Sequence, residues 1–259
     1  NIKFKIMKVK YFDLENKRVF ITGGGSGIGA SIVEHFCEQG SEVYFVDINV
    51  EESKKLIDKI KKLNFKIPNF IKCNLLNIKQ LQEVIRKIII ENGNIDILVN
   101  NAANDQRHEI DEVTEEYWDN RMALNLKHYF FTIQSVKNSM IKNKNGSIIN
   151  LSSLSWMMGV GGMPAYTTAK SGILGLTRSV ARDLGTYNIR VNSVMPGSVS
   201  TERQLKEILT PEYKKFVLSR QCLQRELKPE DVARVVLFIS SNQSSGCTNQ
   251  NFIVDGGTR

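Results

Sequence analysis

Apolar and polar positions along the chain alternate between two periods. Short apolar runs with the character of buried strands are each followed by a stretch whose apolar residues recur with the spacing of one helix face. The pattern predicts strands at residues 17–22, 42–47, 69–75, 95–103, 146–153 and 189–197, with a closing apolar segment at 251–257. It predicts helices at residues 27–40, 50–63, 78–93, 166–185 and near 229–241, with two further helical stretches flanking Asn125. This alternation predicts an α/β fold with one parallel, doubly wound sheet and right-handed crossovers.

The pattern shows no linker, internal repeat or low-complexity block. We therefore expect a single domain over residues 14–259, preceded by a basic N-terminal tail at 1–13. Residues 198–228 lack strand character. They form either a lid over a site or a plain pair of surface helices, and the sequence favours neither.

Composition excludes several classes of protein. No apolar run approaches the ~18 residues that span a membrane, so no membrane partner is expected. The net charge is +8, but the lysines are spread over the whole chain and indicate a solvated surface. The sequence has no cluster of basic residues interleaved with aromatic residues, so no nucleic-acid partner is expected.

The cysteines and histidines indicate neither disulfides nor a metal site. The four cysteines are Cys37, Cys73, Cys222 and Cys247. They form no C-x-x-C pair, which predicts buried free thiols in a reducing cytoplasm. The three histidines are His35, His108 and His128, and their separation lacks the spacing of metal ligands.

A glycine-rich turn follows the first predicted strand. "TGGGSGIG" at residues 22–29 opens the first helix, where glycines permit a tight turn and close approach of the backbone to a pyrophosphate. Asp47 ends the second strand, where a carboxylate accepts hydrogen bonds from the adenosine ribose hydroxyls and repels a 2′-phosphate. These features predict a Rossmann-type sheet that binds NAD rather than NADP.

"YTTAK" supplies the candidate catalytic group. Tyr166 and Lys170 lie one turn apart and so share a face of the same helix. An ammonium beside a phenol favours the phenolate and lowers the phenol pKa, so Tyr166 is expected to act as a base toward an alcohol. Ser153, at the end of the fifth predicted strand, is expected to hold the substrate oxygen.

The order of these motifs resembles the short-chain dehydrogenase/reductase family. T-G-x-x-x-G-x-G, Asp47, "NNAA", Asn125, Ser153, Tyr166, Lys170 and "PGSVST" occur in family order over residues 14–257. The resemblance implies an NAD-dependent dehydrogenase acting on a CH–OH group. It makes Asn125 the fourth catalytic residue, supporting a water that relays protons to Lys170. It also implies a homotetramer, assembled through the long helices and the C-terminal region.

The resemblance also assigns the cofactor contacts. The residues expected to line the pyrophosphate are Gly23, Gly25, Ser26, Gly27, Ile28 and Gly29. Those expected beside adenosine are Asp47, Ile48, Asn74 and Leu75, with Asn74 where the family usually has Asp. Those expected along the ribose and nicotinamide are Asn101, Ala102, Ala103, Tyr166, Lys170, Pro196, Gly197, Val199 and Thr201. Ala103 stands where the family usually has Gly, as does Asn249 in the closing strand.

The substrate prediction depends on the polar segment after the fourth strand. Asn104 and Arg107, together with Ser153, Trp156 and Gln204, offer hydrogen-bonding groups beside a flat aromatic ring, which suits a polyhydroxylated substrate. "NDQRHEIDEVTEEYWDNRMALNL", "SSLSW", "RQCLQ" and "DGGTR" are similar to bacterial NAD-dependent D-xylose 1-dehydrogenases and related aldose dehydrogenases. The hypothesis is hydride transfer from C1 of a cyclic aldose to NAD, giving a lactone. A structural role is the alternative, with Asp105 and Arg107 paired and His108 capping a helix.

Three other functions remain open. One is a dehydrogenase of another hexose or of an anionic sugar, glucose- or sulfoquinovose-like, for which Arg107 and the basic surplus argue. Another is a 3-ketoacyl-type carbonyl reductase, against which Asp47 argues because such reductases usually use NADPH. The third is a silent NAD-binding regulator, against which the complete catalytic group argues.

Overall fold

One parallel sheet runs through the centre of the computed structural model, which describes residues 9–208 and 210–258. Its strands lie in the order β3-β2-β1-β4-β5-β6-β7. They are β1 (Arg18–Thr22), β2 (Glu42–Asp47), β3 (Asn69–Lys72), β4 (Ile97–Asn100), β5 (Gly146–Leu151), β6 (Ile189–Pro196) and β7 (Asn251–Val254). The order reverses between β1 and β4, which is where doubly wound sheets open a crevice for ligands.

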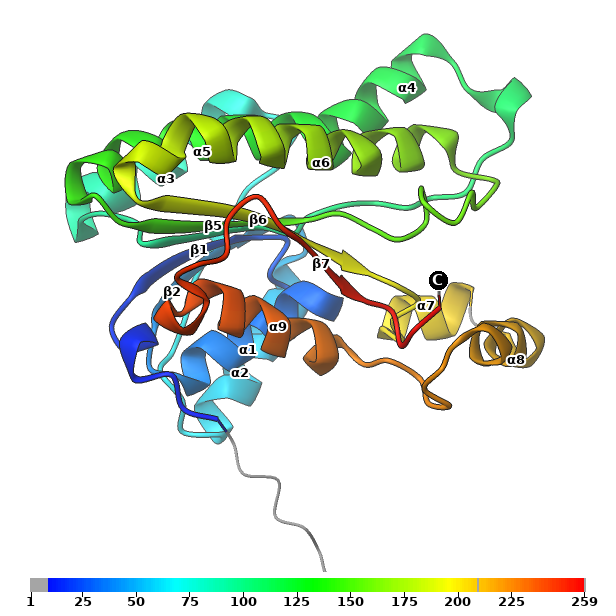
Figure 1. Cartoon of the computed structure of the whole chain (residues 1–259), viewed down its shortest axis with the longest axis horizontal. Coiled ribbons are helices and arrows are strands. Elements are labelled where there is room, and N and C mark those ends of the chain that lie inside the picture. Colours follow the sequence, from blue (N-terminus) through cyan, green and yellow to red (C-terminus); the bar gives the residue numbers. More distant parts are fainter. Residues whose placement is uncertain (1–8, 209, 259) are drawn as a thin grey trace, which may run out of the picture.

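Helices cover both faces of the sheet (Figure 1). One face carries α1 (Gly27–Glu38), α2 (Val50–Lys62) and α9 (Pro229–Ser240). The other carries α3 (Ile78–Asn92), α5 (His128–Asn143) and α6 (Pro164–Leu184). The predicted α/β, Rossmann-type doubly wound fold is therefore confirmed. None of the described helices is both long and apolar enough to cross a membrane.

The remaining helical segments lie in the connections. The longer ones are α4 (Glu115–Met122), a π-helical turn (Ala123–Lys127), α7 (Glu202–Glu207) and α8 (Pro211–Arg220). The 3-10 turns are Phe12–Leu14, Ile110–Glu112, Gly185–Tyr187 and Asn242–Ser244. Figure 1 shows α7 and α8 beyond the carboxyl end of the sheet, apart from the two helical layers.

The central strands are buried on both faces. All residues of β4 and β5 are buried, as their continuous apolar runs require in a parallel sheet. The two asparagines among them are hydrogen-bonded, since Asn100 Nδ2 donates to Asn150 Oδ1 at 3.0 Å and Asn150 Nδ2 donates to Thr177 Oγ1 at 3.0 Å. These two hydrogen bonds link β4, β5 and α6.

Three expectations need correction or limitation. The predicted strand 95–103 ends at Asn100, because the Asn101 N–H donates to Thr22 Oγ1 and leaves the ladder. Only Cys37 and Cys73 are buried, whereas Cys222 is exposed, although all four thiols are free. Most of the predicted basic tail, residues 1–8, lies outside the described residues.

Residues 198–228 contain α7 and α8, with one isolated bridge between Val199 and Leu227. The helix pair is thus present, and closure of this segment as a lid stays a prediction.

Candidate active site

A cavity of about 1210 Å³ opens at the carboxyl end of the strands. The glycine-rich turn, the ends of β2, β4, β5 and β6, the start of α6, and α7 with α8 contribute its walls. All predicted cofactor and substrate residues line it except Trp156. Asn125, which was expected to act on Lys170 through a water, is not part of the cavity wall.

The glycine-rich turn has no room for side chains. A Cβ atom on Gly29 would lie 1.9 Å from the Gly23 carbonyl oxygen, and one on Gly25 would lie 2.6 Å from Ser53 Oγ. Ser26, the N-cap of α1, makes no side-chain capping hydrogen bond. The N–H groups of the first turn of α1 therefore remain available to an anion, which suits the pyrophosphate of a dinucleotide.

Asp47 links the second strand to this turn. Its Oδ2 accepts a hydrogen bond from Gly25 N at 2.8 Å, and its Oδ1 accepts one from Asn49 N at 2.8 Å. Each oxygen keeps a lone pair for a ribose hydroxyl. The next residue is Ile48, which is 64% exposed, where an arginine would accommodate a 2′-phosphate. The residues present fit a nicotinamide dinucleotide.

Ser153, Tyr166 and Lys170 meet at the inner end of the cavity. Tyr166 and Lys170 are on α6, with Lys170 Nζ 5.7 Å from the centroid of the Tyr166 ring, and Ser153 hydrogen-bonds the Tyr166 side chain. Ser153 Oγ also lies 2.9 Å from Ser155 Oγ, a contact that the sequence motif did not indicate. The three predicted groups are thus close enough to act on one hydroxyl.

The expected net lowering of the Tyr166 pKa is wrong for this structure, because the pKa is raised. Although Tyr166 is half-buried as a residue, desolvation of its phenol raises the pKa well above the ordinary value, and Asp105 adds to the rise. The bond to Ser153, Arg203 and Arg107 oppose it. Burial also lowers the pKa of Lys170 to about 7, so its charge is only partly present near neutral pH.

Lys170 has two hydrogen-bond acceptors in the core. Its Nζ donates to the Leu151 carbonyl at 2.7 Å and to the Tyr129 hydroxyl at 3.0 Å. Sequence reasoning missed Tyr129. The available signal was its position one helical turn after Asn125, which places an aromatic hydroxyl on the same side of the chain as a predicted site residue.

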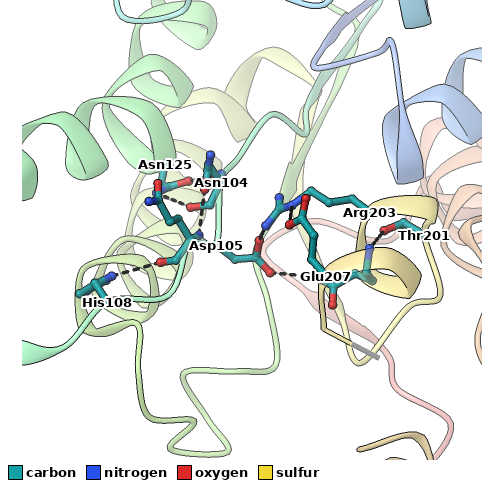
Figure 2. A network of polar contacts seen from close by, with 9 residues as sticks. Asn104, Asp105, His108, Asn125, Thr201, Arg203 and Glu207 are labelled. Atoms are coloured by element: carbon teal, nitrogen blue, oxygen red, sulfur yellow. Dashed lines mark hydrogen bonds and ion pairs between the residues drawn. The ribbon is translucent and has the colours of Figure 1, made fainter. Parts of the chain in front are cut away.

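Asn125 lies in the π-helical turn between α4 and α5 and is buried. Its Oδ1 accepts a hydrogen bond from Asn104 N at 2.8 Å, and its Nδ2 donates to Asn104 O at 3.1 Å. Figure 2 shows this reciprocal pair. The Asn125 side chain therefore holds the backbone of the polar segment after β4, and its relay to Lys170 stays a prediction.

Asp105 connects that polar segment to α7 (Figure 2). It forms an ion pair with Arg203 and accepts a hydrogen bond from Gln204 Nε2 at 2.9 Å. Arg203 Nε also donates to Glu207 Oε2 at 2.9 Å. Residues almost a hundred positions apart are thereby joined at the mouth of the cavity.

Both contacts expected under the structural alternative are wrong. Asp105 pairs with Arg203 rather than Arg107, because the Arg107 guanidinium turns to the Gly161 carbonyl at 2.9 Å. His108 caps no helix: its Nδ1 lies 2.9 Å from the Tyr117 hydroxyl. The indole N–H of Trp156 is buried without a hydrogen-bond partner.

The sheet, the glycine-rich turn and the Ser–Tyr–Lys group define an oxidoreductase that uses a nicotinamide dinucleotide. A family model described as enoyl-(acyl carrier protein) reductase matches residues 23–259. The chain belongs to the short-chain dehydrogenase/reductase family.

Individual relatives cover nearly the whole chain. It is 43% identical over 245 residues to the protein named probable galactose dehydrogenase GalD of Rhizobium meliloti, covering 95% of this chain and 96% of that one. It is 44% identical over 249 residues to D-xylose 1-dehydrogenase of Caulobacter vibrioides, covering 96% and 98%. The structure of Thermoplasma acidophilum aldohexose dehydrogenase superimposes with a TM-score of 0.83 at 30% identity, covering 96% of each chain.

Proposed function

We propose that the chain is an NAD-dependent aldose dehydrogenase that oxidises the C1 hydroxyl of a cyclic, D-xylose-like sugar to a lactone. The observation that carries this proposal is a single cavity in which Ser153 and Tyr166 lie beside the polar residues Asn104, Arg107 and Gln204. A site rich in hydrogen-bonding groups selects strongly for a substrate with hydroxyls. The sugar substrates named for the relatives support the same choice.

NAD is the proposed cofactor. The glycine-rich turn and the start of α1 would hold its pyrophosphate, and the Asp47 carboxylate would accept from the adenosine ribose. When bound, NAD supplies the acceptor for the C1 hydride.

The protein side chains perform the proton chemistry in this proposal. Ser153 donates a hydrogen bond that holds the C1 oxygen, and Tyr166 removes the hydroxyl proton. The cationic Arg107 and Arg203 favour the Tyr166 phenolate, against the desolvation that disfavours it. In this proposal the Lys170 ammonium, 5.7 Å from the Tyr166 ring, adds to their effect when it is charged. Loss of the hydroxyl proton and of the C1 hydride leaves the lactone carbonyl, so atoms and charge balance.

The test is an absorbance assay of reduced cofactor with NAD or NADP and a panel of aldoses, sugar acids and secondary alcohols. We expect turnover with neutral pentoses or hexoses and NAD. Turnover confined to aliphatic alcohols or acyl thioesters would contradict the sugar assignment and favour the carbonyl reductase alternative. A preference for NADP would contradict the role proposed for Asp47.

An anionic sugar is the second candidate substrate. Arg203 is already paired with Asp105 and Glu207, whereas the Arg107 guanidinium contacts a backbone carbonyl and lines the cavity. Arg107 is therefore the residue that would bind a carboxylate or sulfonate. Faster turnover of a sugar acid than of its neutral parent, lost in Arg107→Gln, would favour this candidate.

We further propose that the protein assembles as a homotetramer through its long helices. Phe130, on α5, is 46% exposed, which leaves apolar surface on that helix for a second copy. Sedimentation velocity measures the assembly directly, and a monomer at micromolar concentration would contradict it.

A further inference from the structure

A buried tyrosine outside the predicted catalytic group contacts the proposed catalytic lysine. Tyr129, on α5, is 0% exposed. Its hydroxyl lies 3.0 Å from Lys170 Nζ and 2.9 Å from the Leu151 carbonyl oxygen, and Lys170 Nζ lies 2.7 Å from that same oxygen. The ammonium, the phenol and the carbonyl thus form a closed hydrogen-bonded triangle beneath the cavity.

Donor counting fixes the direction of these bonds. The Tyr129 hydroxyl has one hydrogen, which it donates to the Leu151 carbonyl, so its oxygen accepts from Lys170. Burial and the nearby Tyr166 hold the pKa of Tyr129 well above its ordinary value, so this phenol stays neutral. The Lys170 ammonium has three N–H groups, and two are committed to the core. One remains for the cavity that Lys170 lines.

We propose that Tyr129 is a positioning residue for Lys170: its hydroxyl fixes the ammonium so that a single N–H faces the cavity. The inference rests on the role of Lys170 in the proposed function. The acceptor is itself held in place, because the Tyr129 hydroxyl donates to the Leu151 carbonyl at 2.9 Å and its ring packs against His128 with centroids 4.5 Å apart. A bridging water at the same place would lose entropy on being immobilised, whereas the Tyr129 hydroxyl is already fixed by packing.

The charge state of Lys170 depends on this contact. The titratable groups that face it are Tyr166 on α6, Tyr129 and His128 on α5, and Asp105 in the segment after β4. Burial lowers the Lys170 pKa to about 7, and Asp105 opposes that change. A hydrogen bond accepted from the ammonium favours the charged form. Removing the Tyr129 hydroxyl therefore lowers the fraction of Lys170 that is charged near neutral pH.

The test compares Tyr129→Phe with a matched control, Thr132→Val. The control removes another buried hydroxyl from the same helix, one that bonds Asn100 Oδ1 and the Tyr129 carbonyl rather than Lys170. In protein without added cofactor, ¹³Cε-lysine NMR follows the Lys170 titration, with the resonance assigned by Lys170→Met. We expect Tyr129→Phe to lower the Lys170 pKa by about one unit, the size of one charged hydrogen bond. Thr132→Val leaves it unchanged.

Turnover provides the second readout. We expect kcat of Tyr129→Phe at pH 7 to fall about fivefold with the KM for sugar little changed, because lowering a pKa of about 7 by one unit reduces the charged fraction of Lys170 from about one half to about one tenth. A wild-type Lys170 titration in Tyr129→Phe, or an equal shift in Thr132→Val, overturns the proposal. If Tyr129→Phe does not fold, 4-fluorophenylalanine at position 129 keeps the ring and fills the place of the hydroxyl with a much weaker acceptor, and a downward shift of the Lys170 pKa is again expected.

Failure of the proposed function is visible separately. A wild-type protein that oxidises no sugar contradicts the aldose assignment, while the NMR titration still reports whether Tyr129 controls Lys170. A normal titration in Tyr129→Phe alongside sugar turnover by the wild type contradicts the inference alone.

Discussion

Tyr166 lies under opposing electrostatic influences. Desolvation and Asp105 raise its pKa, while Ser153, Arg203 and Arg107 lower it. If Tyr166 is the general base, Tyr166→Phe should lower kcat by about 10²–10⁴-fold, because no other group supplies the proton transfer. NADH fluorescence titration should give nearly unchanged affinity. Retained activity in a folded Tyr166→Phe protein would contradict the mechanism.

Asp105 and Arg203 should move the pH profile in opposite directions. Asp105 raises the pKa of both Tyr166 and Lys170, so Asp105→Asn should shift both limbs of the kcat/KM profile to lower pH. Arg203 lowers the Tyr166 pKa, so Arg203→Gln should shift the limb that Tyr166 controls to higher pH. Initial rates between pH 5 and 10 measure both. Shifts of the same sign in the two variants would show that these charges do not act on Tyr166.

The proposed preference for NAD over NADP depends on the Asp47 side chain. Asp47→Asn keeps one amide oxygen for Gly25 N or Asn49 N but removes the charge that would repel a 2′-phosphate. We expect the ratio of kcat/KM for NAD over NADP to fall by about tenfold, as expected for a loss of about 1.4 kcal/mol of discrimination. Ile48→Ala is the control, because it alters the neighbouring residue without altering charge. An unchanged ratio in Asp47→Asn would assign the preference elsewhere.

The residues predicted from sequence and those missed differ in how far their partners lie along the chain. Tyr166 and Lys170 could be paired from their helical spacing alone. The partner of Asp105 could not, because Arg203 approaches it only once α7 lies over the cavity, whereas Arg107 is its neighbour in sequence. Local spacing therefore predicted that Tyr166 and Lys170 lie together but misassigned the charge partner of Asp105.

At the scale of elements, the turn between β1 and α1 is the most constrained. Gly29→Ala places a Cβ 1.9 Å from the Gly23 carbonyl oxygen, so either α1 or the turn must move. We expect a loss of about 2 kcal/mol or more of unfolding free energy, within the range of overpacking, and loss of NADH binding. Gly185→Ala is the matched control, because its Cβ meets nothing within 4 Å. Urea unfolding and NADH titration measure both variants, and equal behaviour would contradict the steric argument.

The apolar pattern predicted the ends of strands correctly where the backbone hydrogen bonds continue between neighbouring strands. The strands β1, β2 and β6 lie within one residue of their predicted bounds, since their apolar runs are buried along their length. The fourth strand ended early because Thr22 Oγ1 accepts from Asn101 N and again from Ala102 N. A side-chain oxygen from another strand supplied the partner, and no pattern within residues 95–103 contains that information.

At the scale of the whole molecule, strand order explains why separate motifs form one site. The glycine-rich turn, the "NNAA" segment and Ser153 each follow a strand of the central β1, β4 and β5, whose carboxyl ends lie side by side. Parallel sheets bring such ends to one edge, so the site could be predicted from motif order. The polar contacts in the buried interior between β5 and α5 could not be predicted, because they depend on how the helix packs against the sheet.

That interior makes the stability of the whole molecule sensitive to acid. Burial, with Lys170 adding to it, lowers the pKa of His128 to about 3, although the carbonyls of Leu124 and Ala123 oppose the change. As the pH falls, His128 in the folded protein therefore binds a proton at a lower pH than in the unfolded chain, where a histidine titrates near the ordinary 6.5. Stability from this group is present above about pH 6.5 and is lost as pH falls toward 3, at about 1.4 kcal/mol per pH unit.

His128→Leu should remove this acid sensitivity, because leucine fills a similar volume and cannot be protonated. We expect the variant to resemble the wild type in urea at pH 7.5 and to exceed its unfolding free energy by about 3 kcal/mol at pH 4.5, two units below the ordinary histidine pKa. His35→Gln, at a half-buried position on α1, controls for the loss of a histidine as such. Wild type and His128→Leu losing stability in parallel between pH 7.5 and 4.5 would show that the acid response arises outside the layer between β5 and α5.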